Sequence, residues 1–123
     1  SAFTGKSIEV FNFGNQKRDF TYIDDIVEGI YLSVLNFDSI KGAEILNLGF
    51  GSPTQLMDFI ATIEKYCKKP LNKNFREAQL GDVQCTYASL KKIKKFIPFK
   101  PSIGIDKGVR EFVNWLENYN DLK

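Results

Sequence analysis

Apolar and polar positions change their spacing along the chain, and each change predicts a new element of secondary structure. Residues 7–13, SIEVFNF, are rich in β-branched and aromatic side chains and precede Gly14, which predicts a strand. From residue 21 to about residue 36, apolar residues recur every three or four positions, as in an amphipathic helix. Thr21 and Asp24 form a capping-box pattern that starts this helix at Thr21. Its predicted apolar face consists of Ile23, Ile26, Val27, Ile30 and Val34.

A second strand and helix are predicted in the middle of the chain. Residues 43–51, AEILNLGFG, read as a short apolar strand closed by glycines. In the following SPTQ, Ser52 can cap a helix, Pro53 suits its first position, and Gln55 completes a capping box. Pro70 ends this helical region. Its predicted buried face consists of Leu56, Phe59, Ile60, Ile63 and Cys67.

The remaining sequence predicts a polar connection, a short strand and two further helices. The connection covers residues 72–82 and the strand is DVQCTY, residues 82–87. Ser89 is expected to cap a brief helix, and the last helix runs from Gly104 to about residue 118. Apolar positions on these two helices are Leu90, Ile93 and Phe96, then Ile105, Val109, Phe112, Val113 and Leu116. With no internal repeat, the pattern indicates a mixed α/β fold with more helix than strand, as one domain over residues 1–123.

Composition narrows the possible partners. The 123 residues are 43% hydrophobic, which is enough for one core. Seventeen Lys and Arg against fifteen Asp and Glu leave a net charge of +2, too balanced for a nucleic-acid backbone. The basic run KKIKK, residues 91–95, is interpreted as a solvated helix face. We therefore expect no nucleic-acid partner, while a small anion remains a possible ligand.

Cysteines and apolar runs indicate the compartment. Cys67 and Cys85 show no CxxC spacing and the chain has no histidine, which argues against a zinc site and a disulfide framework. No apolar run approaches the ~20 residues of a membrane span, and no leader pattern opens the chain. We expect a cytoplasmic protein with reduced thiols, no metal and no membrane contact. Because the sequence starts at Ser1 without an initiator methionine, we also expect a piece of a longer chain.

Two short patterns resemble cofactor motifs and are rejected on context. YASLK, residues 87–91, has the Tyr-x-x-x-Lys spacing of a tyrosine proton shuttle, but Ser89 between the two reads as a helix cap. GFGSPT, residues 49–54, follows a predicted strand and opens a predicted helix. It lacks the third glycine of a dinucleotide fingerprint and the acidic residue about twenty positions later. The glycines are more consistent with a tight turn.

Lys17 and Arg18 stand between the first predicted strand and the first predicted helix. Free main-chain N–H groups at such a corner favour an anion, and a guanidinium can hold two phosphate oxygens at once. Arg18 could equally form an ordinary ion pair with Asp19, Asp24 or Asp25. Spacing alone does not decide between these two interpretations.

A family resemblance favours the anion. GKSIEVFNFGNQKRDFTYIDDIVEGI, residues 5–30, closely resembles a segment of UDP-glucuronate 4-epimerases and related nucleotide-sugar epimerases of the extended short-chain dehydrogenase/reductase family. Three further blocks agree in order: ILNLGFGSPTQLMDFIATIEK, QLGDVQCTYASLKKIKKFIPFKP and GVREFVNWLENY. The resemblance covers essentially the whole chain. It implies that the chain is the C-terminal substrate-binding portion of such an enzyme, with a role in polysaccharide biosynthesis.

The resemblance also implies what this portion lacks. In the family, an N-terminal Rossmann domain binds NAD and supplies the Ser/Thr, Tyr and Lys that transfer hydride and protons at C4 of the sugar. We therefore expect no catalytic, NAD-binding or metal-binding residue in this chain, and no activity from it alone. The full-length enzyme would use NAD, the UDP-sugar and the missing Rossmann domain as partners.

What this portion supplies, by the same resemblance, is the contact with UDP. Glu9, Val10 and Phe11 match the strand whose backbone binds uracil, and Arg18 matches the arginine that binds the diphosphate. The remaining matched positions near the ribose and phosphates are Asp82 and Gln79. Gln79 departs from the family, since many relatives have a phosphate-binding arginine there. We expect the phosphate contact to depend more on Arg18, with Arg76 as a candidate helper.

Two apolar segments would normally pack on the missing domain. These are YIDDIVEGIYLSVL, residues 22–35, and ILNLG, residues 45–49. We expect the isolated chain to self-associate in order to cover them, and the protein to be a homo-oligomer.

Two other functions stay open for this chain. It could be part of a related dehydratase or decarboxylase, or a non-catalytic binding remnant without its Rossmann half.

Overall fold

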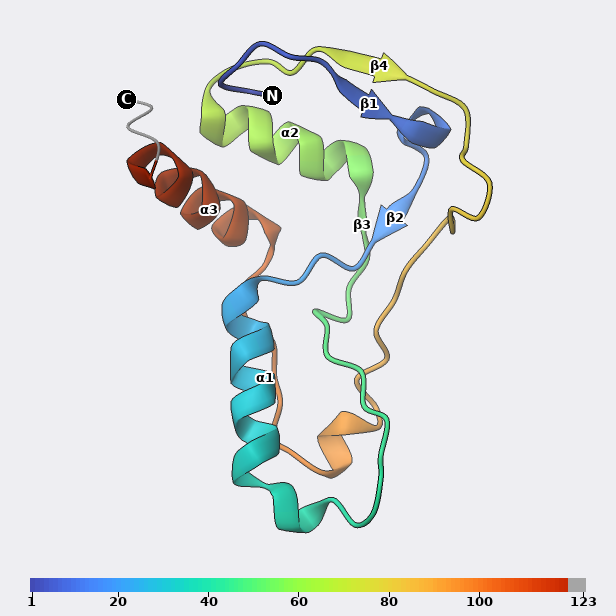
Figure 1. The fold of residues 1–123 in the computed structure, drawn as a ribbon, viewed down its shortest axis with the longest axis vertical. Coiled ribbons are helices and arrows are strands. Elements are labelled where there is room, and N and C mark those ends of the chain that lie inside the picture. The colour runs from blue at the N-terminus through green and yellow to red at the C-terminus, as the bar shows by residue number, and fades with distance from the viewer. Residues whose placement is uncertain (120–123) are drawn as a thin grey trace.

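The computed structural model describes residues 1–119 as a mixed α/β fold that is drawn out along one axis (Figure 1). This confirms the predicted fold class. The elements, in chain order, are β1 (Ile8–Val10), the 3-10 turn η1 (Phe11–Gly14), β2 (Lys17–Arg18), α1 (Ile23–Leu35), η2 (Phe37–Ser39), β3 (Thr54–Gln55), α2 (Leu56–Cys67), β4 (Lys73–Phe75), η3 (Ile93–Lys95) and α3 (Ile105–Tyr119).

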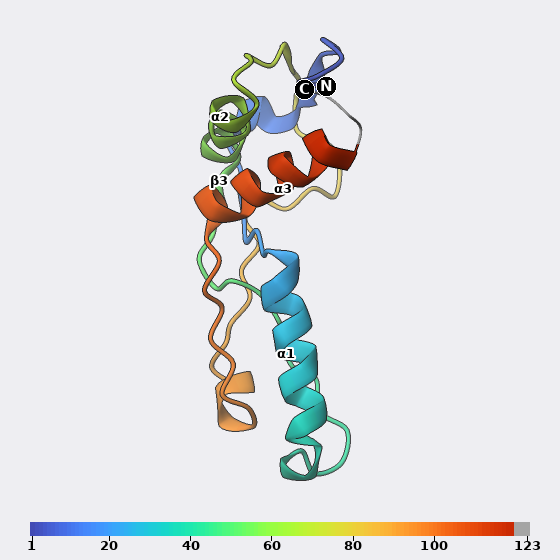
Figure 2. The same cartoon turned by 90° about the vertical axis from the view of Figure 1, so that its left-hand side faces the viewer.

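The two views agree on how these elements divide between the ends of the molecule. One end holds α2, α3, β1 and β4, and the other holds α1 with the segments around residues 40–50 and 88–100 (Figure 2). Between them, β2 pairs antiparallel with β3, Lys17 opposite Gln55 and Arg18 opposite Thr54. The strand carrying Arg18 therefore lies where the two ends meet.

The first predicted strand is shorter than expected. β1 pairs in parallel with β4 from Ile8 opposite Lys73 to Val10 opposite Phe75, and then the chain turns. Asn12 and Phe13 both have φ of 50°, which an extended strand cannot contain. The prediction of a strand to residue 13 is therefore wrong at its C-terminal end. The prediction of an irregular segment at 72–82 also missed β4, whose polar KNF sequence carries no strand pattern.

α2 begins three residues later than its capping pattern predicts. Its N-cap is Gln55, whose side chain makes no capping hydrogen bond, and Thr54–Gln55 form β3 instead. Pairing with β2 thus overrides the local SPTQ signal. The predicted buried face is confirmed, since Ile60 and Cys67 are buried and the other three members are partly buried against the core.

α3 follows its predicted course and packs on α2. The predicted start and end are confirmed within a residue. Val109 and Val113 are buried with Cys67 in one core cluster. At the open edge of this contact, Asp106 accepts hydrogen bonds from Lys65 Nζ at 2.6 Å and Tyr66 Oη at 2.5 Å.

α1 also forms where its apolar period predicts, although its capping box is absent. The helix starts at Ile23, and Thr21 Oγ1 accepts a hydrogen bond from Phe50 N at 3.0 Å instead of capping. One side of α1 lies so close to the 46–50 and 97–100 segments that a Cβ on Gly29 would be 2.3 Å from Leu48 Cδ2. The predicted position of the helix is therefore confirmed, and its predicted cap is wrong.

Three other expected elements are not regular structure. Residues 43–51 form no strand, since no other segment of the described chain pairs with them in a sheet. Residues 82–87 contribute a single bridge, Lys17 to Cys85. Ser89 caps no helix, since η3 starts at Ile93 with Lys92 as its N-cap. The four lysines of KKIKK are exposed around the buried Ile93 side chain, as predicted. They do not form a helix face, since Lys94 and Lys95 lie in the 3-10 turn η3 and the other two precede it.

Much of the outer face of α1 is uncovered. Exposed large apolar residues on this helix and just beyond it are Ile23, Val27, Ile30, Tyr31, Val34, Leu35 and Phe37. Ile45, in the second segment expected to pack on another domain, is 86% exposed. None of the helices in residues 1–119 combines the length and apolarity of a transmembrane helix.

Candidate functional site

β2 is held on both sides by backbone hydrogen bonds. It pairs with β3 on one side, and on the other Lys17 N donates to Gln84 O at 2.9 Å and Thr86 N donates to Lys17 O at 3.2 Å. Side chains alternate along a strand, so Lys17 and Arg18 point to opposite faces. Lys17 is exposed, whereas the Arg18 side chain is only 23% exposed. The fixed backbone therefore places one cation in water and one in a partly enclosed site.

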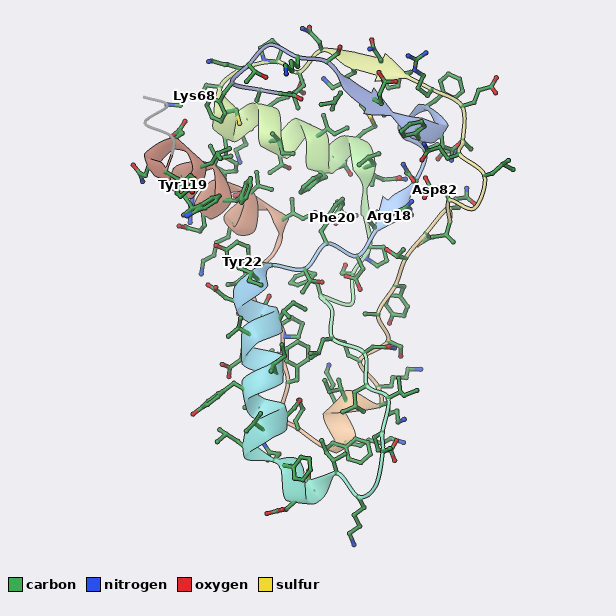
Figure 3. The ribbon with its side chains drawn as sticks, viewed as in Figure 1. Arg18, Phe20, Tyr22, Lys68, Asp82 and Tyr119 are labelled. Carbon is green, nitrogen blue, oxygen red and sulfur yellow. The ribbon has the colours of Figure 1, made fainter. Side chains whose placement is uncertain are left out.

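The Arg18 guanidinium contacts three oxygen atoms. Its Nη2 donates to Asp82 Oδ1 at 2.7 Å and to Gln16 Oε1 at 2.5 Å, and its Nη1 donates to the Lys17 carbonyl at 2.8 Å. Figure 3 shows Arg18 on β2 with Asp82 beside it, on the chain that returns from β4. Two predicted site residues, 64 positions apart, are thus in direct contact.

Arg18 does not form the local ion pairs that its sequence neighbours suggested. Asp19 instead accepts backbone hydrogen bonds from Gly51 N at 3.0 Å and Ala88 N at 2.8 Å. Asp25 is buried and accepts from Ser102 N and Ile103 N, both at 3.0 Å. These two carboxylates fix the loops around β2 and α1. The partner of Arg18 is Asp82, which comes from a distant part of the chain.

Asp82 ends a tight turn that also carries Gln79. Asp82 N donates to Gln79 O at 3.1 Å, and Gly81 has φ of 86°, a conformation that favours glycine. All four residues of the turn are exposed. Gln79 and Asp82 are therefore placed together beside β2 on a segment with little packing of its own.

The three residues of the predicted uracil-binding strand differ in access. The Val10 side chain is 1% exposed and belongs to the core, so only its backbone could meet a ligand. Its carbonyl already accepts a hydrogen bond from Arg76 N at 2.9 Å. Phe11 is partly exposed at the start of η1.

Glu9 and Arg76 form a second acid–arginine pair at this edge. Arg76 Nε donates to Glu9 Oε2 at 2.5 Å. The hydrogen bond from Arg76, assisted by one from Asn74, holds the pKa of Glu9 below its ordinary value. Arg76, the candidate helper of Arg18 in binding phosphate, is therefore paired with Glu9 on β1. Both side chains are well exposed, at 59% and 42% for Arg76 and Glu9, so this pair is open to competition from a ligand.

Gln16 connects these regions and was missed by sequence reasoning. It is 8% exposed, its Nε2 donates to Phe11 O at 3.5 Å, and its Oε1 accepts from Arg18. One amide thus joins the predicted uracil strand to the predicted phosphate residue. No pattern in GNQKRD marks this glutamine, since its role depends on the turn at residues 12–15.

The two rejected cofactor motifs also fail in three dimensions. Tyr87 lies outside the helices, so Tyr87 and Lys91 do not share a helical turn. At Gly49 a Cβ would be 2.4 Å from the Ala88 Cβ, and at Gly51 it would be 3.1 Å from Leu90. These glycines allow close packing with residues 88–90, as expected of a tight turn.

A large apolar cavity lies away from Arg18. It measures about 530 Å³, lies between α2, α3 and the N-terminal residues, and includes Phe20, Tyr22 and Phe59 among its lining residues. Neither Arg18 nor Asp82 lines it. Across residues 1–119 no cluster of three or more Cys, Asp or Glu side chains is suited to a metal ion.

Comparisons with known proteins support the expected resemblance. Residues 1–49 match the NAD dependent epimerase/dehydratase family. An uncharacterized protein of Methanocaldococcus jannaschii is 49% identical over 116 residues, covering 93% of this chain and 34% of that protein. The UDP-glucuronate 4-epimerase of Thermodesulfobacterium geofontis is 37% identical over 118 residues, covering 95% of this chain and 35% of that enzyme.

A solved structure of a nucleotide-sugar epimerase is similar to this chain in fold. A variant of the UDP-glucuronic acid 4-epimerase of Bacillus cereus, in complex with UDP-4-deoxy-4-fluoro-glucuronic acid and NAD, is 25% identical with a TM-score of 0.76. The match covers 97% of this chain and 40% of that one. The chain resembles nucleotide-sugar epimerases of the extended short-chain dehydrogenase/reductase type. This confirms the resemblance predicted from the sequence.

The epimerase-like chain spans about a third of the length of the curated relatives it matches. The activity, substrate and cofactor of those longer proteins come to this chain only as proposals.

Proposed function

We propose that residues 1–123 are the nucleotide-sugar-binding portion of a longer NAD-dependent 4-epimerase that acts on a UDP-sugar, with UDP-glucuronate as the first candidate. The observation that carries the proposal is the contact between Arg18 and Asp82. Their counterparts by resemblance bind the diphosphate and the ribose, and in this fold a partly buried guanidinium and an exposed carboxylate lie 2.7 Å apart. Relatives named as UDP-glucuronate 4-epimerases support the choice of sugar.

In this proposal the chain binds and positions, and another part of the protein does the chemistry. Arg18 holds the diphosphate, the backbone of Glu9 to Phe11 meets the uracil, and Asp82 and Gln79 lie near the ribose and phosphates. A Rossmann half would bind NAD, which accepts and returns hydride, and would supply the catalytic side chains. We therefore expect the isolated chain to be inactive as an isomerase.

The test is UDP binding measured by calorimetry on this chain and on two single variants. Arg18→Ala removes charge-assisted hydrogen bonds that contribute about 1.5 to 3 kcal/mol each, so UDP affinity should fall at least about tenfold. Lys17→Ala is the matched control, because it removes the same charge from the opposite face of β2. It should change UDP affinity by less than about twofold. Equal losses in the two variants, or no loss in Arg18→Ala, would contradict the proposal.

A related dehydratase or decarboxylase is the second candidate, and the matched family includes dehydratases. Such an enzyme would share the nucleotide contact and differ in the remaining part of the protein. Product analysis of the longer protein with UDP-glucuronate and NAD distinguishes the two. A 4-epimer of unchanged mass supports the epimerase, and loss of water or carbon dioxide supports the sister activity. A coding sequence without an upstream glycine-rich loop would instead favour a non-catalytic remnant.

A further inference from the structure

The Nη2 hydrogen bonds of Arg18 are placed so that they block a two-pronged contact with a diphosphate. A guanidinium offers two edges that can bind an anion through two parallel hydrogen bonds, and each edge uses one Nη2 hydrogen. In this structure both Nη2 hydrogens are engaged, one by Gln16 Oε1 and one by Asp82 Oδ1. A two-pronged contact with phosphate therefore requires that one of these acceptors leave.

The two acceptors differ in how firmly they are held. Gln16 is 8% exposed, its backbone N donates to Gly14 O, and its carbonyl accepts from Leu56 N. Asp82 lies on the exposed turn of residues 79–82, and its side chain is 31% exposed. A Cβ on Gly81 would meet no atom within 4 Å, so nothing packs against this corner. Asp82 is the acceptor that can move without disturbing the core.

We propose that Asp82 is a displaceable latch: its carboxylate occupies Arg18 in the place of a phosphate and is expelled when the diphosphate binds. Gln16 is the fixed positioning residue that keeps the guanidinium oriented during the exchange. This inference rests on the proposed function, since it concerns the same diphosphate site. The released Asp82 carboxylate becomes available to the ribose hydroxyl groups, the role that the resemblance gives it.

A latch and a positioning role for Asp82 predict opposite changes in phosphate affinity when the Asp82 carboxylate is removed. If Asp82 only held Arg18 in place, its removal would weaken phosphate binding. As a competitor for Arg18, its removal strengthens phosphate binding. Inorganic pyrophosphate is the suitable probe, because it carries the phosphates without the ribose that Asp82 would also contact.

The experiment is a pyrophosphate titration of this chain, followed by NMR, in the wild type, Asp82→Asn and Asp106→Asn. Asp82→Asn should tighten pyrophosphate binding about fivefold, the change expected when a partly exposed ion pair no longer competes. Asp106→Asn is the charge-matched control, because it breaks an exposed ion pair with Lys65 between α2 and α3. It should leave pyrophosphate affinity within about twofold of the wild type.

Three results would overturn the latch: weaker or unchanged binding in Asp82→Asn, equal tightening in both variants, or no pyrophosphate binding by either the wild type or Asp82→Asn. The UDP titration of Arg18→Ala separates these failures from failure of the proposed function. If Arg18→Ala loses UDP binding while Asp82→Asn does not tighten pyrophosphate binding, the site stands and the latch is wrong.

Discussion

At the scale of single residues, the acidic side chains around Arg18 have separate tasks that their spacing conceals. Asp19 and Asp25 bind backbone N–H groups of distant loops, and Asp82 alone of these acids contacts the guanidinium. The sequence could not assign these tasks, because each partner lies at least thirty residues away. Arg18 and Asp82 are predicted as site residues only through the family resemblance, and the structure shows that they are in contact.

Asp25 provides the residue-scale prediction. Asp25→Ala should lower the free energy of unfolding by about 2 to 4 kcal/mol, because the N–H groups of Ser102 and Ile103 lose their acceptor in a buried place. Urea unfolding measures the change. The neighbouring exposed Asp24→Ala should cost no more than about 1 kcal/mol, through its favourable position in the first helical turn. Equal effects would show that Asp25 has no special structural role.

At the scale of elements, apolar periodicity predicted the positions of the helices but not the strands or the helix caps. α2 and α3 bury the apolar stripes that predict them, whereas most of the apolar stripe that predicts α1 is exposed. In all three helices the position could still be read from the spacing. Strands and caps could not, because β3, β4 and the start of α2 are fixed by pairing with residues far along the chain. The candidate site is built on those pairings, which is why Gln16 was not predicted.

Glu64 provides the element-scale prediction, because it joins α2 to β4 and to the residue Leu71 just before that strand. Its carboxylate accepts hydrogen bonds from Lys73 Nζ and from Leu71 N. These contacts, that of Lys73 first, lower the pKa of Glu64 below its ordinary value. The folded chain therefore gains stability above the ordinary glutamate pKa of about 4.3 and loses it as the pH falls through the lower folded pKa.

Glu64→Gln should accordingly reduce stability at pH 7 by about 0.2 to 1 kcal/mol, since the pair is partly exposed. The difference from the wild type should shrink toward zero as the pH falls below the folded pKa of Glu64. Thermal unfolding from pH 2 to pH 7 measures it, with exposed Glu28→Gln as the control. A difference that stays constant across this pH range would contradict the assignment.

At the scale of the whole molecule, the uncovered apolar surface is the main structural liability. Soluble monomers rarely expose large contiguous apolar patches, and here the outer face of α1 is unpacked along its length. The isolated chain should therefore show a mass in sedimentation experiments that rises with concentration. Val34→Lys, at a residue 68% exposed on α1, should reduce that rise.

Leu80→Lys is the control for self-association, because it adds the same charge at a fully exposed leucine on the turn beside β2, away from α1. It should leave the concentration dependence nearly unchanged. A wild-type chain that sediments as a monomer at high concentration would contradict the expectation, and an equal response to both variants would place the contact elsewhere than α1.

The central claim for the whole molecule is that one partly buried guanidinium recognises the charged part of a uridine nucleotide. The most direct measurement follows the Arg18 Nε–H signal in nitrogen-15 NMR while UDP is added, and repeats the titration with uridine. We predict a saturable shift of this signal with UDP and little shift with uridine, because only UDP carries the diphosphate. An Arg18 signal that does not respond to UDP, or responds equally to uridine, would contradict the account.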